Sequence, residues 1–172
     1  MESQWNVICE LTDLNVLGTN GRSSKPPQRK VRAILVRPDG KLALMHEGAS
    51  GLYALPGGGL EDGEDAQAAL VRELFEETGC SCDAVTPLGI IAENRYHADL
   101  TRFSYFFVVH TKSTEANPHF TEEELRLGTT QLWCDLDEAT ALIRGECCDT
   151  PQKKFLQARD LAALDAYKNS RL

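Results

Sequence analysis

Three glutamates stand close together near the middle of the chain, at positions 73, 76 and 77. If the segment around them is helical, the spacing i, i+3 and i+4 puts Glu73, Glu76 and Glu77 on one face. Like charges at that spacing repel, and negative charge near a helix C-terminus opposes the macrodipole, so helix stability alone does not select them. Carboxylate oxygens are the ligands that hard cations such as Mg²⁺ prefer. The cluster is therefore a candidate metal site, with a solvated acidic face as the alternative.

A run of three glycines, Gly57 to Gly59, lies shortly before the glutamates. Glycine has no Cβ, so the backbone of such a loop can approach a ligand closely, and a loop carbonyl could join the carboxylates as a ligand. The loop is not a Walker loop, because no Gly-Lys-Ser/Thr follows at the required spacing. The helix that must carry the glutamates is expected from about Asp65 to Thr78, with Gly79 as its C-terminal stop.

The glycine loop and the glutamates together form one longer pattern that resembles the Nudix box. That box reads Gly, five residues, Glu, seven residues, Arg-Glu-hydrophobic, one residue, Glu-Glu, one residue, Gly-hydrophobic. Every fixed position is filled in this chain, by Gly58, Glu64, Arg72, Glu73, Leu74, Glu76, Glu77, Gly79 and Cys80. Only the last is a soft match, and cysteine behaves as a small hydrophobic residue. With nine constrained positions in 23 residues, the pattern is a specific signal.

The resemblance implies hydrolysis of a pyrophosphate bond in a nucleoside diphosphate linked to another moiety, with Mg²⁺ or Mn²⁺ as cofactor. The implied substrate is a small-molecule nucleotide, either a nucleoside triphosphate (oxidised or not) or a nucleotide sugar such as ADP-ribose. Water would attack phosphorus while metal neutralises phosphate charge, and a carboxylate would take the proton. A catalytically silent, Nudix-like nucleotide-sensing module is the alternative, and product release from a nucleotide panel distinguishes the two.

The roles of the box residues also follow from the resemblance, position by position. The implied metal ligands are the carbonyl of Gly58 and the carboxylates of Glu73, Glu76 and Glu77. The implied catalytic positions are Glu73, Glu76 and Arg72. Glu64 and Gly79 are structural positions of the box, and Glu64 with Arg72 would brace the loop and the helix, as outer groups orient ligands elsewhere.

Residues outside the box are weaker candidates. A base could stack on an aromatic ring and a guanidinium could hold a phosphate, which makes candidates of Tyr53, Arg95, Tyr96 and Phe103. The alternatives are aromatic packing and a surface ion pair. An extra base or metal ligand could come from Glu93, Glu122, Glu123 or Glu124. For the last three a local explanation competes, because Thr121 and Glu124 have the spacing of a helix capping box.

The elements that must position these residues alternate between strand and helix patterns. Strands are expected at residues 7–14, 31–36, 41–46, 80–91, 102–111 and 131–134, with 31–36 and 41–46 as a hairpin, and helices at 65–78, 137–143 and 150–169. This order predicts an α+β fold, an α/β/α sandwich. The resemblance implies the Nudix fold, a mixed β-sheet between helices with the box as loop–helix–loop. Residues 1–28 are expected to be an N-terminal arm and linker, and 29–172 the Nudix domain.

The composition narrows the partners. The 172-residue chain has 18 basic and 26 acidic residues, a formal net charge of −8, which argues against a nucleic-acid polymer as partner. No stretch approaches the ~20 apolar residues of a membrane span, so no membrane partner is expected. The six cysteines lack zinc-site spacing, and no signal-peptide pattern is seen, which predicts a cytoplasmic protein with free thiols. A homodimer that exchanges the N-terminal arm stays open.

Overall fold

The structure is a computed structural model and describes residues 5–112 and 116–170, so the first four residues of the expected N-terminal arm lie outside it. In the described part, seven strands form one sheet: β1 (Val7–Thr12), β2 (Gln28–Val36), β3 (Leu42–Glu47), β4 (Leu52–Ala54), β5 (Ala84–Arg95), β6 (Leu100–His110) and β7 (Thr129–Cys134). The helices are α1 (Asp13–Leu17), α2 (Ala66–Thr78), α3 (Glu122–Arg126), α4 (Leu136–Arg144) and α5 (Pro151–Ser170), with a 3₁₀ turn η2 (Tyr96–Ala98).

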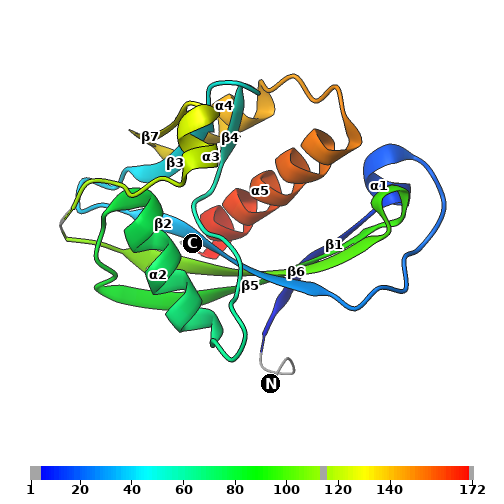
Figure 1. Cartoon of the computed structure of the whole chain (residues 1–172), viewed down its shortest axis with the longest axis horizontal. Coiled ribbons are helices and arrows are strands. Elements are labelled where there is room, and N and C mark those ends of the chain that lie inside the picture. The colour runs from blue at the N-terminus through cyan, green and yellow to red at the C-terminus, as the bar shows by residue number, and fades with distance from the viewer. Residues whose placement is uncertain (1–4, 113–115, 171–172) are drawn as a thin grey trace.

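The sheet is mixed and lies between helices (Figure 1). Its strand order is β1-β5-β6-β2-β3-β4, and β7 pairs with β3 on the remaining edge. The pairs β1–β5 and β2–β6 are parallel, and the other pairs are antiparallel. Helix α2 covers one face, and α4 with α5 covers the other. The predicted α+β sandwich is therefore confirmed.

Two hydrophobic cores fill the spaces between the layers. Strand β2 shows why, since successive side chains of a strand point to opposite faces. Val31, Ala33 and Leu35 pack with the apolar side of α2, while Ile34 and Val36 belong to the core beneath α5. The face beneath α5 is important for the site, because the positions of β2 that precede Ile34 on this face carry charged residues.

Helix α2 matches its prediction closely, because both of its ends are marked by local signals. The side chain of Asp65 accepts hydrogen bonds from the N–H groups of Gln67 and Ala68, at 2.9 and 2.8 Å. At the other end Gly79 adopts a φ of +66°, and its N–H donates to the carbonyl of Phe75. A cap and a left-handed glycine are the usual start and stop of a helix.

Several strand boundaries differ from the prediction. The strand expected at 7–14 ends at Thr12, whose side chain caps the short helix α1. The strand expected at 80–91 instead spans Ala84–Arg95, since its polar end is buried against charged partners on β6 and α5. Strand β4 lies shortly before the glycine loop, where no strand was expected.

The expected hairpin is reduced to a single pair. Strands β2 and β3 meet only at Val36 and Leu42, and β3 pairs over its length with β7. At the other end of the sheet, β1 pairs in parallel with β5, so the described part of the N-terminal segment is built into the sheet. Among the described residues, no helix combines the length and the apolar character needed to cross a membrane.

Candidate active site

The glycine loop of the box runs along the first half of β2, where β3 does not reach. The N–H of Ala33 donates to the carbonyl of Pro56 at 2.9 Å, and the N–H of Val31 donates to the carbonyl of Gly58 at 3.0 Å. Gly57 has a φ of +131°, and a Cβ there would collide with the carbonyl oxygen of Val31. The loop therefore needs glycine at this position to lie against the strand.

Arg72 is the centre of the polar contacts in the box. Its Nε and Nη2 donate to the two carboxylate oxygens of Glu64 at 3.1 and 3.0 Å, and Nη2 also donates to the carbonyl of Gly59 at 3.0 Å. Its Nη1 donates to Glu73 at 3.0 Å and to Glu76 at 3.4 Å. The hydrogen bonds from Arg72 hold the pKa of Glu64 below its usual range. One guanidinium thus ties the loop to the helix.

Glu73 lies against the glycine loop. Its side chain is 15% exposed, and a Cβ at Gly58 would occupy the space of its carboxylate. The Gly58 carbonyl, implied above as a metal ligand, already accepts the Val31 N–H, which uses one of its two lone pairs. The neighbouring carbonyl of Gly57 accepts a hydrogen bond from Nη1 of Arg32.

Glu77 reaches the same loop from the next turn of the helix. The N–H of Gly57 donates to its Oε2 at 2.6 Å. Burial raises the pKa of Glu77 to about 7, against the opposing effects of the Arg32 charge and the Gly57 hydrogen bond. The negative charges of Glu73 and Glu124 add to the increase. The carboxylate is therefore held in a poorly solvated position beside a cation.

The three glutamates have the side-chain chemistry and the location expected of ligands to a divalent cation. All supply oxygen ligands, and all lie near the C-terminal end of α2, two of them against the glycine loop. Within the described residues, however, no three acidic, histidine or cysteine side chains already converge as a metal cage. Arg72 engages Glu73 and Glu76, and Gly57 engages Glu77. Glu76 is 49% exposed, so it can rotate toward a cation without losing a packed position.

The aromatic candidates outside the box differ in their surroundings. Tyr53, on β4, stacks on His46 with 4.5 Å between ring centroids, and its N–H donates to Glu146. Tyr96 is more than half exposed in η2. Phe103 is half-buried and packs on the core beneath α2. Of the three, Tyr53 lies nearest in sequence to the glycine loop.

The charged candidates on β5 are buried. Nη2 of Arg95 lies 2.6 Å from Oε2 of Glu93, and both side chains are almost inaccessible to solvent. The guanidinium of Arg95 also lies over the ring of Phe155, 4.9 Å from its centroid. The surface ion pair considered for Arg95 is therefore wrong, because this pair lies beneath α5.

The three consecutive glutamates begin helix α3. The carboxylate of Glu124 accepts a hydrogen bond from the N–H of Thr121 at 2.7 Å, and the Thr121 side chain accepts the N–H of Glu124, which completes the capping box. Glu123 lies 3.7 Å from Arg126 in an exposed ion pair, and Glu122 is exposed. The local explanation thus accounts for Glu124 without chemistry.

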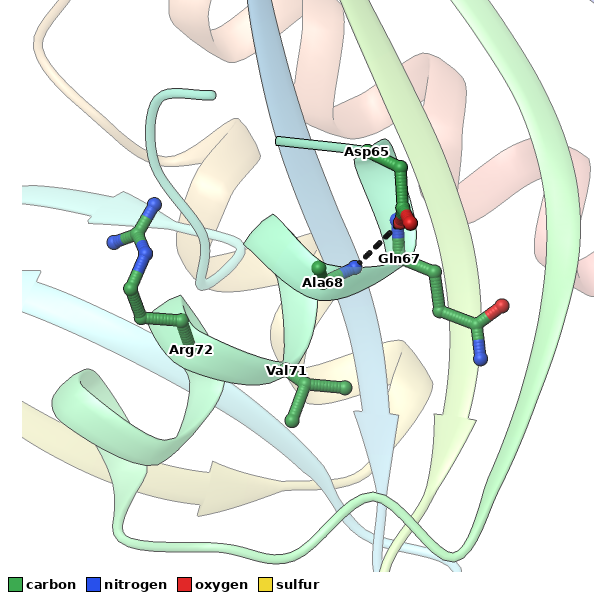
Figure 2. Close-up of a pocket in the computed structure, with 5 residues that line it drawn as sticks. All are labelled: Asp65, Gln67, Ala68, Val71 and Arg72. Carbon is green, nitrogen blue, oxygen red and sulfur yellow. Dashed lines mark hydrogen bonds between the residues drawn. The ribbon is translucent and has the colours of Figure 1, made fainter. Parts of the chain in front are cut away.

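Surface pockets lie near the box. One follows the outer side of α2 and is lined by Asp65, Gln67, Ala68, Val71 and Arg72 (Figure 2). Figure 2 shows Arg72 and Gln67 pointing in opposite directions from the helix, and none of the three glutamates lines this pocket. Another pocket lies between β4 and α4, and its lining includes Tyr53, Glu146 and Cys147.

The NUDIX domain model matches residues 26–152. The chain belongs to the NUDIX family. The match covers the whole box, the strands from β2 to β7 and helix α4, so the family predicted from the box is confirmed. A NUDIX hydrolase from Nitrosomonas europaea has the same fold, with a TM-score of 0.63 and 23% identity, over 84% of this chain and 90% of that one.

Curated NUDIX relatives match over shorter regions. Diphosphoinositol polyphosphate phosphohydrolase 3-alpha from Mus musculus is 26% identical over 118 residues, which is 69% of this chain and 67% of that protein. A MutT-like protein from Streptomyces ambofaciens is 37% identical over 59 residues, 33% of this chain and 38% of that protein. The matched region thus spans well under half of the Streptomyces protein.

Sequence reasoning missed four charged residues around the box. These are Lys30 and Arg32 on β2, Arg102 on β6 and Asp160 on α5. Lys30 and Arg32 alternate along a strand, which is a signal for one shared face that was available in the sequence. Asp160 accepts the N–H of Leu55 at 3.2 Å across 105 positions, and nothing local marks that contact.

Proposed function

We propose that this NUDIX protein is a pyrophosphohydrolase that depends on Mg²⁺ or Mn²⁺ and acts on a small nucleotide. Water attacks one phosphorus of the pyrophosphate bond, and the candidate substrates are a nucleoside triphosphate or a nucleotide sugar such as ADP-ribose. The observation that supports this most is the folded box itself, in which Glu73 and Glu77 lie against the loop Gly57–Gly59. The net charge of −8 favours a small nucleotide over a nucleic-acid polymer.

The residues of the box have different roles in the proposed reaction. Glu73, Glu76 and Glu77 would hold the metal, which supplies charge neutralisation of the phosphate and a more acidic bound water. Arg72 and Glu64 fix the loop against the helix through a two-point hydrogen bond, and so keep the ligands in position. Glu76 is the most exposed of the three carboxylates and is open to solvent, which suits a group that accepts a proton from water.

The test is a panel of nucleoside triphosphates, oxidised nucleotides and nucleotide sugars, incubated with the full chain and Mg²⁺ or Mn²⁺. Products are separated by chromatography. We expect at least one substrate to be cleaved, and EDTA to abolish the cleavage. Glu76→Gln and Glu77→Gln should each lower the rate at least about tenfold, because each removes a metal ligand.

Asp137→Asn is the matched control, since it removes an exposed carboxylate on α4 outside the box, and it should keep the parent rate. Full activity in both box variants would contradict the proposed metal ligands. Binding of nucleotides with no product from any of them would instead support the silent sensing module.

A further inference from the structure

The pocket between β4 and α4 is separate from the box glutamates, none of which lines it. It has a volume of about 450 Å³, within the range of roughly 300–1,000 Å³ that is usual for small-molecule sites. Figure 1 shows β4 and α4 next to each other at one end of the sheet. This pocket, here called the β4–α4 pocket, is therefore large enough for one ring of a ligand and its immediate substituents.

The walls of the β4–α4 pocket are largely apolar. Tyr53 contributes from β4, and its ring is held in place by stacking on His46, with 4.5 Å between the ring centroids. Ala141 and Leu142, successive residues of α4, contribute from the other side. Small-molecule sites combine such walls with a few polar groups that fix orientation. The walls suit the apolar faces of a flat ring.

Glu146 supplies a polar group whose position is fixed by the end of α4. The N–H of Gly145 donates to the carbonyl of Ala141 at 2.9 Å, and the N–H of Glu146 donates to that of Ile143 at 3.3 Å. Oε1 of Glu146 accepts the N–H of Tyr53, whereas its buried Oε2 has no hydrogen-bond partner among the described residues. Leaving a buried polar atom unsatisfied is costly. Because Glu146 lines the pocket, a ligand there can supply the partner of Oε2.

The charges around Glu146 leave its carboxyl group in two forms near neutral pH. Burial raises the pKa of Glu146 to about 7, and the negative charge of Asp160 adds to the increase, while Lys153 and Arg159 oppose it. Each of these two cations is itself paired, Lys153 with Asp149 at 3.0 Å and Arg159 with Asp160 at 2.7 Å. Neither therefore takes the place of a hydrogen-bond partner for Oε2.

The two forms of the carboxyl group ask for different partners at the same atom. Ionised, Oε2 accepts an N–H. Protonated, it donates an O–H, because Oε1 already faces the N–H donor of Tyr53. A ring nitrogen next to an amino group, as in adenine or cytosine, offers an acceptor and a donor side by side. An amino-substituted nitrogen heterocycle therefore satisfies Oε2 in either form.

The β4–α4 pocket is close to the box along the chain. Tyr53 and Gly57 are four residues apart, which is at most about 14 Å of fully extended backbone. The N–H of Gly57 donates to Glu77 of the box. A nucleotide with its phosphates at the box glutamates therefore has this pocket within reach of its base.

We propose that the β4–α4 pocket binds an amino-substituted nitrogen heterocycle, with its ring against Tyr53 and Leu142 and its amino edge at Oε2 of Glu146. The ring belongs to the substrate or to a separate molecule such as a free nucleoside. The first source rests on the proposed function and narrows it to adenine or cytosine nucleotides. The second does not depend on hydrolysis.

The first test uses binding rather than turnover. Adenosine and purine riboside, which differ only in the amino group, are each titrated into the full chain in EDTA, with calorimetric detection. Adenosine should bind at least about tenfold more tightly. In Glu146→Gln the amide oxygen still accepts the Tyr53 N–H, so the amide nitrogen, which only donates, takes the place of Oε2. The preference for adenosine should then shrink to at most about threefold, whereas a merely structural effect would weaken both nucleosides equally.

Two further variants complete the comparison. Ala141→Phe fills the pocket from an exposed helix position, and it should weaken adenosine binding at least about tenfold without touching Glu146. Asp137→Asn removes an exposed carboxylate of α4 outside the pocket and should bind both nucleosides as the parent chain does. If the parent binds neither nucleoside, or binds both equally, or if Glu146→Gln keeps the full preference, the proposal is overturned.

The second test separates the two sources of the ring. The values of kcat/KM for ATP and for purine riboside triphosphate are measured with Mg²⁺ in the parent chain and in Glu146→Gln. If the pocket holds the base of the substrate, the ratio of the two values should fall at least about tenfold in the variant. An unchanged ratio, with nucleoside binding as expected, assigns the pocket to a separate molecule. If no nucleotide is cleaved while nucleoside binding responds as expected, the pocket stands and the proposed hydrolysis fails.

Discussion

The three box glutamates have the same side chain but very different surroundings. Glu73 is packed against Gly58, Glu76 is half exposed beside Arg72, and Glu77 is half-buried and accepts the N–H of Gly57. Helical spacing predicted their common face, because that depends only on local geometry. Their burial depends on the loop that folds against β2, which no spacing in the sequence encodes. The sequence therefore predicts which residues form the site, and the fold decides how each one is solvated.

Glu146 is a residue outside the box whose ionisation the fold changes. Its Oε1 accepts the N–H of Tyr53, and its buried Oε2 has no partner among the described residues. Burial raises the pKa of Glu146 to about 7. The folded chain thus holds this proton more tightly than the unfolded chain, where a glutamate titrates near about 4.3.

The consequence is a loss of stability as pH rises. The stabilising contribution of protonated Glu146 is fully present below about pH 4.3 and disappears as pH passes through about 7. We expect the Tm of the parent chain to fall between about pH 5 and about pH 8, and the fall to be smaller in Glu146→Gln. The control is Glu138→Gln, because Glu138 is exposed and lines the same pocket as Glu146. The Tm of this variant should fall as much as that of the parent chain. If the Tm falls equally in all three proteins, Glu146 is not the group responsible for the loss of stability.

Among the elements, those with local signals were predicted and those fixed by distant contacts were not. Helix α2 has its cap at Asp65 and its stop at Gly79, so its position could be taken from the sequence. The far end of β5 was missed because Glu93 and Arg95 do not resemble strand residues until their charged neighbours are known. The pairing of the glycine loop with β2 was also missed. The loop occupies the part of β2 where the hairpin partner β3 was expected, and only the tertiary structure shows this.

The C-terminal end of α2 gives a prediction about this element. Gly79 has a φ of +66°, and a Cβ there would collide with the carbonyl of Ala116. Gly18 ends α1 with a φ of +74° and open space around it. Gly18→Ala should therefore cost about 1–2 kcal/mol for the left-handed backbone alone, and Gly79→Ala clearly more. Urea unfolding of both variants measures the difference, and equal losses would show that the contact with Ala116 is unimportant.

For the molecule as a whole, helices from both faces of the sheet contact the glycine loop. Helix α2 brings the glutamates from one face, and α5 brings Arg159 and Asp160 from the other. The carboxylate of Asp160 accepts the N–H of Leu55, which directly precedes Pro56 and Gly57 of the loop. Helix α5 was predicted from its sequence pattern at residues 150–169. Its polar contact with the loop joins residues far apart in sequence, so only the tertiary structure reveals it.

Removing the Asp160 carboxylate should therefore weaken the fold and the loop together. Asp160→Ala leaves Arg159 buried without its partner, which typically costs about 3–5 kcal/mol of unfolding free energy. Asp160→Asn keeps an acceptor for the Leu55 N–H while losing the charge, so it separates the ion pair from the loop contact. Asp165→Ala, an exposed position on α5, should change stability by less than about 0.5 kcal/mol. Denaturant unfolding of the three variants supplies the comparison. If Asp160→Ala is as stable as Asp165→Ala, α5 does not hold the loop, and the glutamates are positioned from the α2 side alone.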